Sequence, residues 1–266
     1  MEKEQAIRLF MFDTGVLKCK ENNIKMNASL DSYEIPVPWF FIKHPKGNII
    51  IDGGNAVECA ANAREYWGDI CDVYWPEMKE EEGCYNTIKN LGIDPDSVKF
   101  VLQSHLHLDH TGAIGRFANA THIVHRKEYE YAYTADWFAK GGYIRNDFDK
   151  PNLKWDFLDI ENHDLYDVMG DGSVLIVPTP GHSPGHCSFI VNLPQNGSII
   201  ITGDAVYTED HWEDKALPGF LTSASDAARS VAKLRVIAKR ANAFVITGHD
   251  PLTWNDLKKG ATEFYE

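Results

Sequence analysis

The chain has 266 residues, of which 44% are hydrophobic, so it can bury a sizeable core, and we expect a single domain spanning residues 1–266. Its 39 acidic and 26 basic residues give a formal net charge of -13 with no basic patch, which argues against a nucleic acid partner. No apolar run approaches the ~18 residues of a membrane span, and the charged amino terminus lacks the apolar core of a secretory signal. We therefore expect no membrane association and a cytoplasmic location.

The first half of the chain is rich in apolar runs that predict β-strands. These strands cover 6–15, 39–44, 48–54 and 98–103. Residues 45–47 predict a hairpin-like turn between the second and third strands, and 79–91 suit a helix that ends near Gly92. The fourth strand runs directly into the sequence SHLHLDH at 104–110.

The second half shows the same alternation of strands and helices. Strands are predicted at 173–182, 187–193, 198–207 and 243–250. Helical spacing of apolar residues predicts a helix over 225–241. The favoured architecture is an α/β fold in which helices flank the sheets and polar residues gather where strands end.

The stretch SHLHLDH places four side chains that can bind metal in one short loop. His105 and His107 are two residues apart and can point the same way from an extended chain. Asp109 and His110 lie one short turn farther on and can face a second ion. Imidazole and carboxylate ligands together suit zinc and neighbouring first-row metals rather than calcium or magnesium.

Two metal ions need more ligands than this loop contains. Three further candidates stand where predicted strands end, and they are His182, Asp204 and His249. A glycine precedes each of them, which allows the backbone to turn sharply and to approach an ion closely.

The order of these residues resembles the metallo-β-lactamase superfamily. Within it, SHLHLDHTG, GHSPGH, GDAVY and the GHD near the carboxyl terminus are most similar to the N-acyl homoserine lactonases, which are quorum-quenching enzymes. The resemblance runs from about residue 35 to the end of the chain. It implies an αββα sandwich with a dinuclear metal site at one edge.

The resemblance also implies a role for each residue. One metal ion would be held by His105, His107 and His182, the other by Asp109, His110 and His249, and Asp204 would bridge them. Zinc is the chemical default, although cobalt, manganese and iron fit the same ligands. A hydroxide shared by the two ions would open the lactone ring. Tyr207 would donate to the developing oxyanion, and Asp109 would relay a proton to the leaving oxygen.

Other polar residues near these motifs have more modest interpretations. Ser183 is expected to be a turn residue rather than a nucleophile. His186 is expected to be structural or to support the ligands, because the lactonase spacing selects His182 as the ligand. Asp52 either braces the ligands through hydrogen bonds, as the resemblance implies, or caps a turn before two glycines.

Three segments are candidates for the walls of a substrate site. The aromatic segment 66–78 either contacts an apolar acyl chain, with Trp75 as the leading candidate, or forms a buried extension or the contact of a homodimer. Segment 137–148 is a second candidate wall, and segment 18–27 is a candidate rim.

Three classes of function compete for this sequence. The first is hydrolysis of a small-molecule substrate, an N-acyl homoserine lactone, and we expect this function. The second is hydrolysis of another lactone, a thioester or a phosphodiester on the same scaffold. The charge of -13 argues against a nuclease, and no basic cluster is visible for glutathione. The third is a redox or binding module like the flavodiiron proteins, which carry a carboxylate in the metal loop where this chain has His107, and a further flavin domain.

Overall fold

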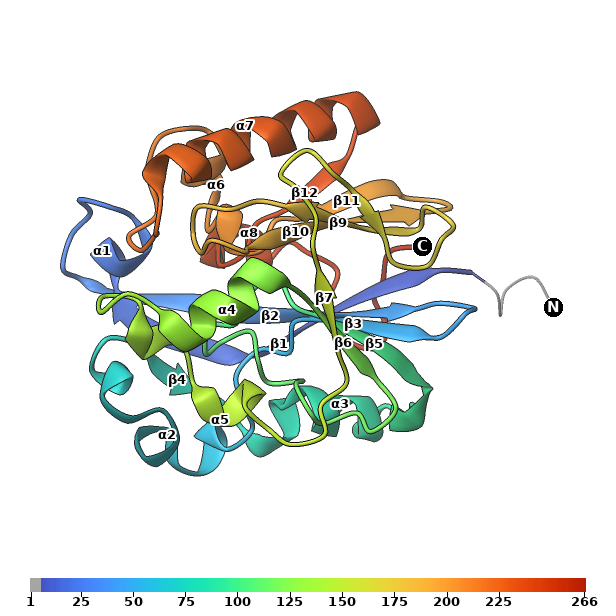
Figure 1. Cartoon of the computed structure of the whole chain (residues 1–266), viewed down its shortest axis with the longest axis horizontal. Helices are drawn as coiled ribbons and strands as arrows, with labels where there is room; N and C mark the ends of the chain where they lie inside the picture. The colour runs from blue at the N-terminus through green and yellow to red at the C-terminus, as the bar shows by residue number, and fades with distance from the viewer. Residues whose placement is uncertain (1–5) are drawn as a thin grey trace.

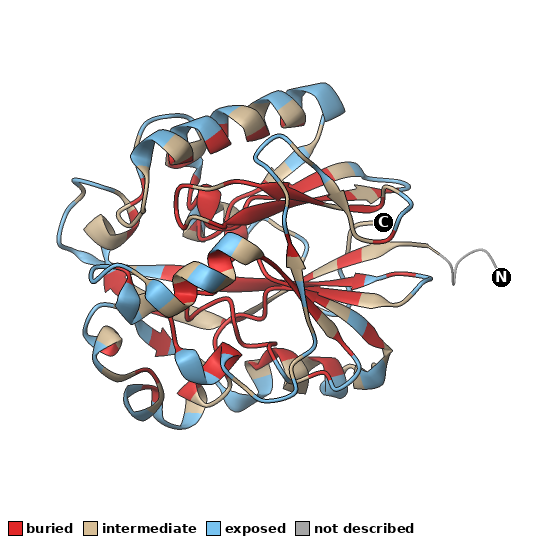
Figure 2. Cartoon of the chain, viewed as in Figure 1, coloured by how far each residue is buried: buried red, intermediate tan, exposed pale blue. Residues whose placement is uncertain are grey.

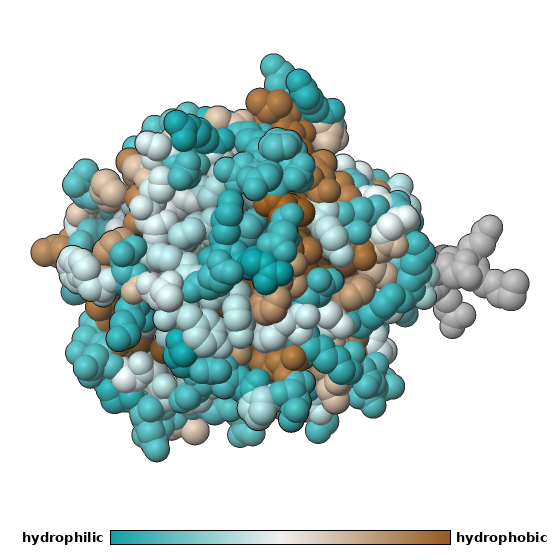
Figure 3. Space-filling model, viewed as in Figure 1, coloured by the Kyte–Doolittle hydropathy of each residue, from teal (hydrophilic) through white to brown (hydrophobic). Residues whose placement is uncertain are grey.

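Two β-sheets pack face to face in the computed structural model, which describes residues 6–266 (Figure 1). Residues 1–5 of the charged amino-terminal segment lie outside the described residues. Helices cover the outer surfaces of both sheets, so the layers follow the order αββα (Figure 1). Buried residues concentrate in the sheets and exposed residues on the outer sides of the helices (Figure 2). The face of the molecule seen in Figure 3 is mostly hydrophilic, with scattered hydrophobic groups.

The larger sheet has the strand order β4-β1-β2-β3-β5-β6-β7 among the described residues. Its strands are β1 (Arg8–Lys20), β2 (Ser32–Lys43), β3 (Asn48–Ile51), β4 (Trp75–Glu77), β5 (Val98–Leu102), β6 (Thr121–His125) and β7 (Trp155–Leu158). Strands β4, β1, β2 and β3 pair antiparallel, whereas β3, β5, β6 and β7 pair parallel. The predicted turn at 45–47 joins β2 to β3, as expected.

The smaller sheet has the strand order β12-β11-β10-β9-β8. Its strands are β8 (Tyr166–Asp167), β9 (Val174–Pro178), β10 (Cys187–Leu193), β11 (Gly197–Ile201) and β12 (Phe244–Ile246). Because β9 and β11 both pair antiparallel with β10, and β12 pairs parallel with β11, strands β9, β11 and β12 run in one direction. Their carboxyl ends therefore meet at one edge of the sheet.

The core between the sheets follows from the alternation of side chains along each strand. Leu9 and Met11 of β1 point to the same face and are fully buried, and Phe189 and Val191 of β10 face them from the other sheet in one hydrophobic cluster. Burial of apolar surface between the two sheets stabilises their stacking.

The helices occupy both outer layers. They are α1 (Glu21–Ile24), α2 (Cys59–Trp67), α3 (Cys84–Asn90), α4 (Arg126–Thr134), α5 (Arg145–Phe148), α6 (Glu209–Trp212), α7 (Ala224–Ala241) and α8 (Pro251–Trp254), with 3-10 turns η2 (Gly68–Asp72), η3 (Glu80–Glu82), η4 (Pro95–Ser97), η5 (Lys140–Gly142) and η6 (Gly203–Ala205). Helix α7 packs Val231 and Leu234 onto the smaller sheet. It begins after Ser223, whose hydroxyl accepts from the Asp226 N–H, and ends at Asn242 in the left-handed conformation. No helix of residues 6–266 is both long and apolar enough to span a membrane.

The prediction of one helix over 79–91 is wrong. The chain forms the short turn η3, becomes extended at Gly83 with φ -56° and ψ 136°, and starts α3 only at Cys84. A Cβ on Gly83 would lie 3.0 Å from Val57 Cγ2, so the chain turns here in close contact with a neighbouring segment.

Candidate metal centre

The seven predicted ligands lie together and are buried, at the edge where strands of both sheets end. The loop 104–110 follows β5, His182 follows β9, Asp204 lies in η6 after β11, and His249 follows β12. Residues separated by more than a hundred positions therefore converge because the strands before them end at the same edge.

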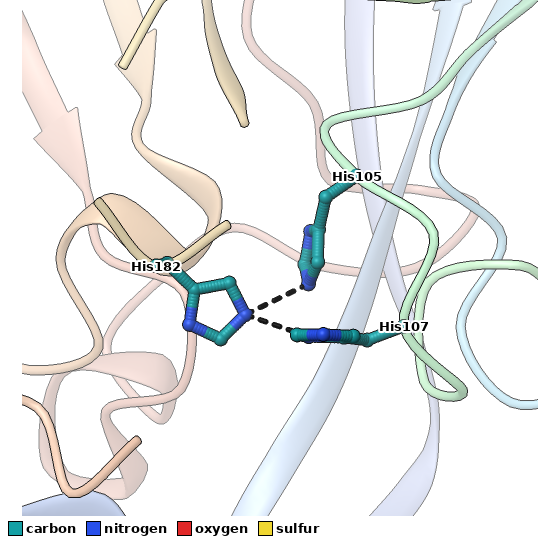
Figure 4. Close-up of side chains that lie close together, drawn as sticks. All are labelled: His105, His107 and His182. Carbon is teal, nitrogen blue, oxygen red and sulfur yellow. Dashed lines mark hydrogen bonds between the residues drawn. The ribbon is translucent and has the colours of Figure 1, made fainter. Parts of the chain in front are cut away.

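His105, His107 and His182 form the first group of this centre. His182 Nε2 lies 3.1 Å from His105 Nε2 and 2.7 Å from His107 Nδ1, so three ring nitrogens face one another (Figure 4). All three atoms lie within 4.8 Å of each other, a spacing at which one ion can contact all of them.

The second group consists of Asp109, His110 and His249, whose ligand atoms also lie within 4.8 Å of one another. Asp109 Oδ1 lies 3.6 Å from His110 Nε2, and Asp109 Oδ2 lies 3.6 Å from His249 Nε2. The two groups are adjacent, because the His105 and His110 rings have their centroids 4.1 Å apart.

Asp204 stands between the two groups. Its Oδ2 atom lies 3.6 Å from His105 Nε2 and 3.3 Å from His182 Nε2. Its Oδ1 atom lies 3.3 Å from His110 Nε2 and 3.0 Å from His249 Nε2. Each carboxylate oxygen therefore faces a different group, which is the arrangement that a bridging ligand requires.

The donor set of this centre fits divalent metal ions. His110 Nε2 and Asp204 Oδ1 are buried and have no hydrogen-bond partner. An unpartnered buried polar atom is costly, and a cation between these groups would satisfy both atoms. Neutral imidazole and carboxylate ligands suit zinc and related first-row metals.

Asp52 supports the loop that carries the first predicted ligands. Its carboxylate accepts hydrogen bonds from the backbone N–H of Ser104 (2.7 Å), from the Ser104 hydroxyl (2.8 Å) and from His110 Nδ1 (2.8 Å). The last bond leaves His110 Nε2 free to face the centre. The bracing interpretation of Asp52 is therefore confirmed. Its φ of 58° places it at the sharp turn after β3.

The outward nitrogens of two other predicted ligands, His249 and His182, are also held in place. His249 Nδ1 donates to the carbonyl oxygen of Pro36 at 2.8 Å, which leaves its Nε2 as the bare nitrogen. His182 Nδ1 lies 3.0 Å from the Tyr207 hydroxyl. Such contacts fix the tautomer and the orientation of a metal-binding imidazole.

His186 has the supporting role that the sequence predicted. Its Nε2 accepts the backbone N–H of Asp204 at 3.0 Å, and its Nδ1 lies 2.9 Å from the Thr179 hydroxyl. His186 thus holds the backbone of the central carboxylate and belongs to none of the three-residue groups that could hold an ion.

Burial and nearby charges shift the pKa values of the histidines in opposite directions. Burial, together with the neighbouring histidines, lowers the pKa of His105 and His107 well below the usual value. Burial also acts to lower the pKa of His110, but Asp204, Asp109 and Asp52 outweigh it and raise that pKa well above the usual value. The histidines in turn outweigh the effect of burial on Asp204 and hold its pKa well below the usual range.

An apolar cavity opens beside this centre, and all three predicted wall segments contribute to it. Segment 66–78 supplies Ile70, Val73 and Tyr74, and segment 137–148 supplies Phe138, Ala139 and Gly142. Segment 18–27 supplies Asn23 and Ile24. Ligands from both groups line the same cavity, as does Tyr207. The cavity therefore connects an apolar region to the candidate metal centre.

Trp75 is not part of this wall, so that prediction is wrong. It lies in β4, is 44% exposed and pairs with Lys18 of β1. Alternation along β4 buries Pro76 and directs Trp75 away from the core.

Sequence reasoning also missed several wall residues, among them three with apolar side chains in β1, β2 and a later loop. Leu17 of β1, Ile35 of β2 and Phe220 of the loop before α7 line the cavity. The ring centroid of Phe220 lies 5.4 Å from those of His107 and His182. An apolar residue in a strand or loop carries no local signal that it faces a cavity, because only the packing of distant segments creates that cavity.

Comparisons with known proteins agree with this geometry. The family model of the metallo-β-lactamase superfamily matches residues 33–249. N-acyl homoserine lactonase AttM of Azorhizobium caulinodans is 61% identical over 261 residues, which cover 98% of this chain and 99% of that protein. An N-acyl homoserine lactonase of Bacillus thuringiensis is 29% identical over 248 residues, which cover 91% and 93%.

A solved structure is similar over the whole fold. It is an N-acyl homoserine lactone hydrolase with the product N-hexanoyl-L-homoserine bound at its catalytic metal center. The match has a TM-score of 0.87 and 27% sequence identity, and it covers 98% of this chain and 100% of that one. The predicted αββα fold class is confirmed.

Proposed function

Because this chain belongs to the metallo-β-lactamase superfamily and, within it, to the N-acyl homoserine lactonases, we propose that it hydrolyses the lactone ring of N-acyl homoserine lactones. The observation that carries the proposal is an apolar cavity whose polar end consists of Tyr207 and two adjacent ligand groups. This combination suits a substrate with a small polar ring and an apolar acyl tail. Water adds across the ring ester: its hydroxyl joins the carbonyl carbon, the ring C–O bond breaks, and the ring oxygen takes the proton.

In this proposal the seven residues would hold two divalent cations. His105, His107 and His182 would hold one, Asp109, His110 and His249 would hold the other, and Asp204, whose two oxygens face different groups, would serve both. When bound, two such ions lower the pKa of water enough to supply a nucleophile at neutral pH and polarise a carbonyl oxygen. We propose zinc as the native metal on the basis of the ligand types.

Tyr207 donates a hydrogen bond to the lactone carbonyl oxygen as negative charge develops on it. If His182 presents Nε2 to the centre, its Nδ1 carries the proton and donates to the Tyr207 oxygen 3.0 Å away. The phenol proton is then free for the substrate. Burial, with the nearby Asp204 charge, raises the pKa of Tyr207 well above its usual value, so the phenol stays protonated.

Asp109 moves the proton to the leaving ring oxygen. It lines the cavity, and burial raises the pKa of its carboxyl above the usual value despite the nearby His110 and His249. As a carboxylate that lines the cavity beside the proposed cation position, Asp109 is placed to take up a proton and return it to the ring oxygen.

Three statements about domain organisation, location and assembly complete the proposal. We propose that residues 1–266 act as one hydrolase domain. We also propose that the protein works in the cytoplasm and forms a homodimer. Size measurement in solution and fractionation of cells test the last two directly.

The proposal is tested with a substrate panel and metal-free protein. Long- and short-chain acyl homoserine lactones should be opened by the metal-loaded protein and not after chelation, and metal addition should restore the activity. A β-lactam, a thioester and a phosphodiester complete the panel. Hydrolysis of one of these three compounds, without hydrolysis of any homoserine lactone, would contradict the proposed substrate. The assignment to a hydrolase fold would still hold.

A further inference from the structure

Glu128 of α4 is a fully buried carboxylate that the proposed reaction does not use. Its exposed fraction is 0%, it does not line the cavity, and it forms no salt bridge within residues 6–266. A buried carboxylate without a cation must be stabilised by hydrogen bonds, so its donors indicate what it holds in place.

Four donors point at this carboxylate. Oε1 accepts the backbone N–H of Leu106 and the hydroxyl of Tyr143, both at 3.1 Å. Oε2 accepts the hydroxyl of Ser183 at 2.5 Å and the backbone N–H of Gly185 at 3.3 Å. Two of the donors are backbone groups, which have a fixed direction.

The donors come from the segments that carry one ligand group. Leu106 lies between His105 and His107, and Ser183 directly follows His182. The ring of the third donor, Tyr143, packs against that of His107 with centroids 4.5 Å apart.

The turn after His182 also sits directly on α4. A Cβ on Gly185 would lie 2.2 Å from the backbone nitrogen of Glu128, so only glycine permits this approach. The other ligand group has no hydrogen bond to Glu128 and is held by Asp52 at His110 and by the Pro36 carbonyl at His249. Asp52 also reaches His105, because the Ser104 hydroxyl donates to Asp52 and lies 3.0 Å from His105 Nδ1.

We propose that Glu128 is a positioning residue for one of the two cation positions, the one formed by His105, His107 and His182. The inference rests on the dinuclear site proposed above. It adds that the hydrogen bonds of Glu128 go only to residues beside, or packed on, the ligands of this position, so a change at Glu128 weakens one position and spares the other.

Glu128→Gln is a sharp test because the amide keeps the shape of the carboxylate. Its NH₂ group must face one pair of donors. The hydroxyls of Tyr143 and Ser183 can rotate and accept from it, but the N–H of Leu106 or Gly185 then loses its acceptor. The substitution therefore disturbs the backbone beside a ligand of the first group. Glu130→Gln, on the exposed side of the same helix, is the matched control.

The experiment is titration of chelator-treated full-length protein with Co²⁺ or Zn²⁺ against a competing indicator, without any activity readout. Wild-type protein and Glu130→Gln should bind two ions. Glu128→Gln should bind one of them about 10- to 100-fold more weakly, which is the usual effect of losing a group that orients a ligand. The visible absorption of bound cobalt should change for that ion alone.

Double variants identify the affected position. Glu128→Gln combined with His182→Ala should add little to the loss from His182→Ala alone, because both act on one position. Combined with His249→Ala, it should weaken both positions. Equal weakening of both ions by Glu128→Gln alone, or unchanged affinities, would overturn the inference.

A purely structural role has a different signature. It would lower the thermal midpoint of the metal-free protein and leave both affinities unchanged. If Glu128→Gln does not fold, Ser183→Ala removes a single donor and should weaken the same ion by a smaller factor. Failure of wild-type protein to bind two ions would instead contradict the proposed dinuclear site.

Discussion

Shortening Ile70 should separate long-chain from short-chain substrates. Ile70 lines the cavity next to the metal centre, and a Cβ on Gly141 would lie 3.3 Å from Ile70 Cδ1, so this side chain closes the wall against segment 137–148. Ile70→Ala removes every side-chain carbon beyond Cβ. An acyl tail long enough to reach that wall loses contact there, whereas a butanoyl tail ends closer to the lactone ring.

The size of the effect follows from the apolar contact that is lost. One buried methylene contributes about 0.8 kcal/mol, so the loss of one or two contributes roughly 0.8–1.6 kcal/mol. This corresponds to a decrease in kcat/KM of about 4- to 15-fold for a decanoyl substrate. The kcat/KM for a butanoyl substrate should be nearly unchanged.

The assay compares kcat/KM for both substrates in wild-type protein, Ile70→Ala and Trp75→Ala. Trp75 is the control, since it lies a few residues away and loses more atoms, but it is exposed outside the cavity. Its substitution should not change the ratio between the two substrates. An equal loss for both substrates in Ile70→Ala, or a larger change of the ratio in Trp75→Ala, would refute the placement of the tail.

Three further measurements test the centre and the fold. The protein should contain two metal ions per chain and lose activity in chelator. Asp204→Asn should weaken the binding of both ions, since each oxygen of Asp204 faces one ligand group, and metal analysis of both proteins measures this. Tyr207→Phe should keep both ions but lower kcat/KM by about tenfold or more, up to ~10²–10³ in kcat, and unchanged kinetics would assign Tyr207 to packing. Hydrogen bonds from Lys46 and Ser173 hold the pKa of Asp171 below its usual value of 3.8, so its stabilising effect exists above about pH 4 and disappears as the pH falls further. Asp171→Asn should therefore lower the free energy of unfolding of metal-free protein at pH 7 more than at pH 3, and an equal difference at both would contradict this.

Local patterns in the sequence were enough to predict the ligand loop and much of the secondary structure. The spacing in SHLHLDH and the glycines before His182, Asp204 and His249 are features of short stretches. The predicted helix over 225–241 matches α7, because its apolar spacing and its Ser223 cap act within a few turns. The expectation that polar residues gather where strands end depends only on each strand and the residues that directly follow it.

The errors arose where packing outweighed local preference. The helix predicted over 79–91 is interrupted at Gly83, where another segment approaches closely. Strands β6 and β7 were not predicted, because polar residues limit their apolar runs to two residues, Ile123–Val124 in β6 and Phe157–Leu158 in β7. The aromatic composition of 66–78 identified a wall correctly but could not indicate that Trp75 faces outward.

What the sequence determined by itself is the chemistry available, namely imidazoles and carboxylates at strand ends beside apolar segments. Only the tertiary structure decided how these groups act together. The two oxygens of Asp204 face different ligand groups, and Glu128 collects donors from three separate segments. Phe220 reaches the rings of His107 and His182 from a loop far along the chain. These contacts join residues that are distant in sequence. Their geometry is set by the packing of the two sheets and their helices, and no short stretch of residues carries a signal for that packing.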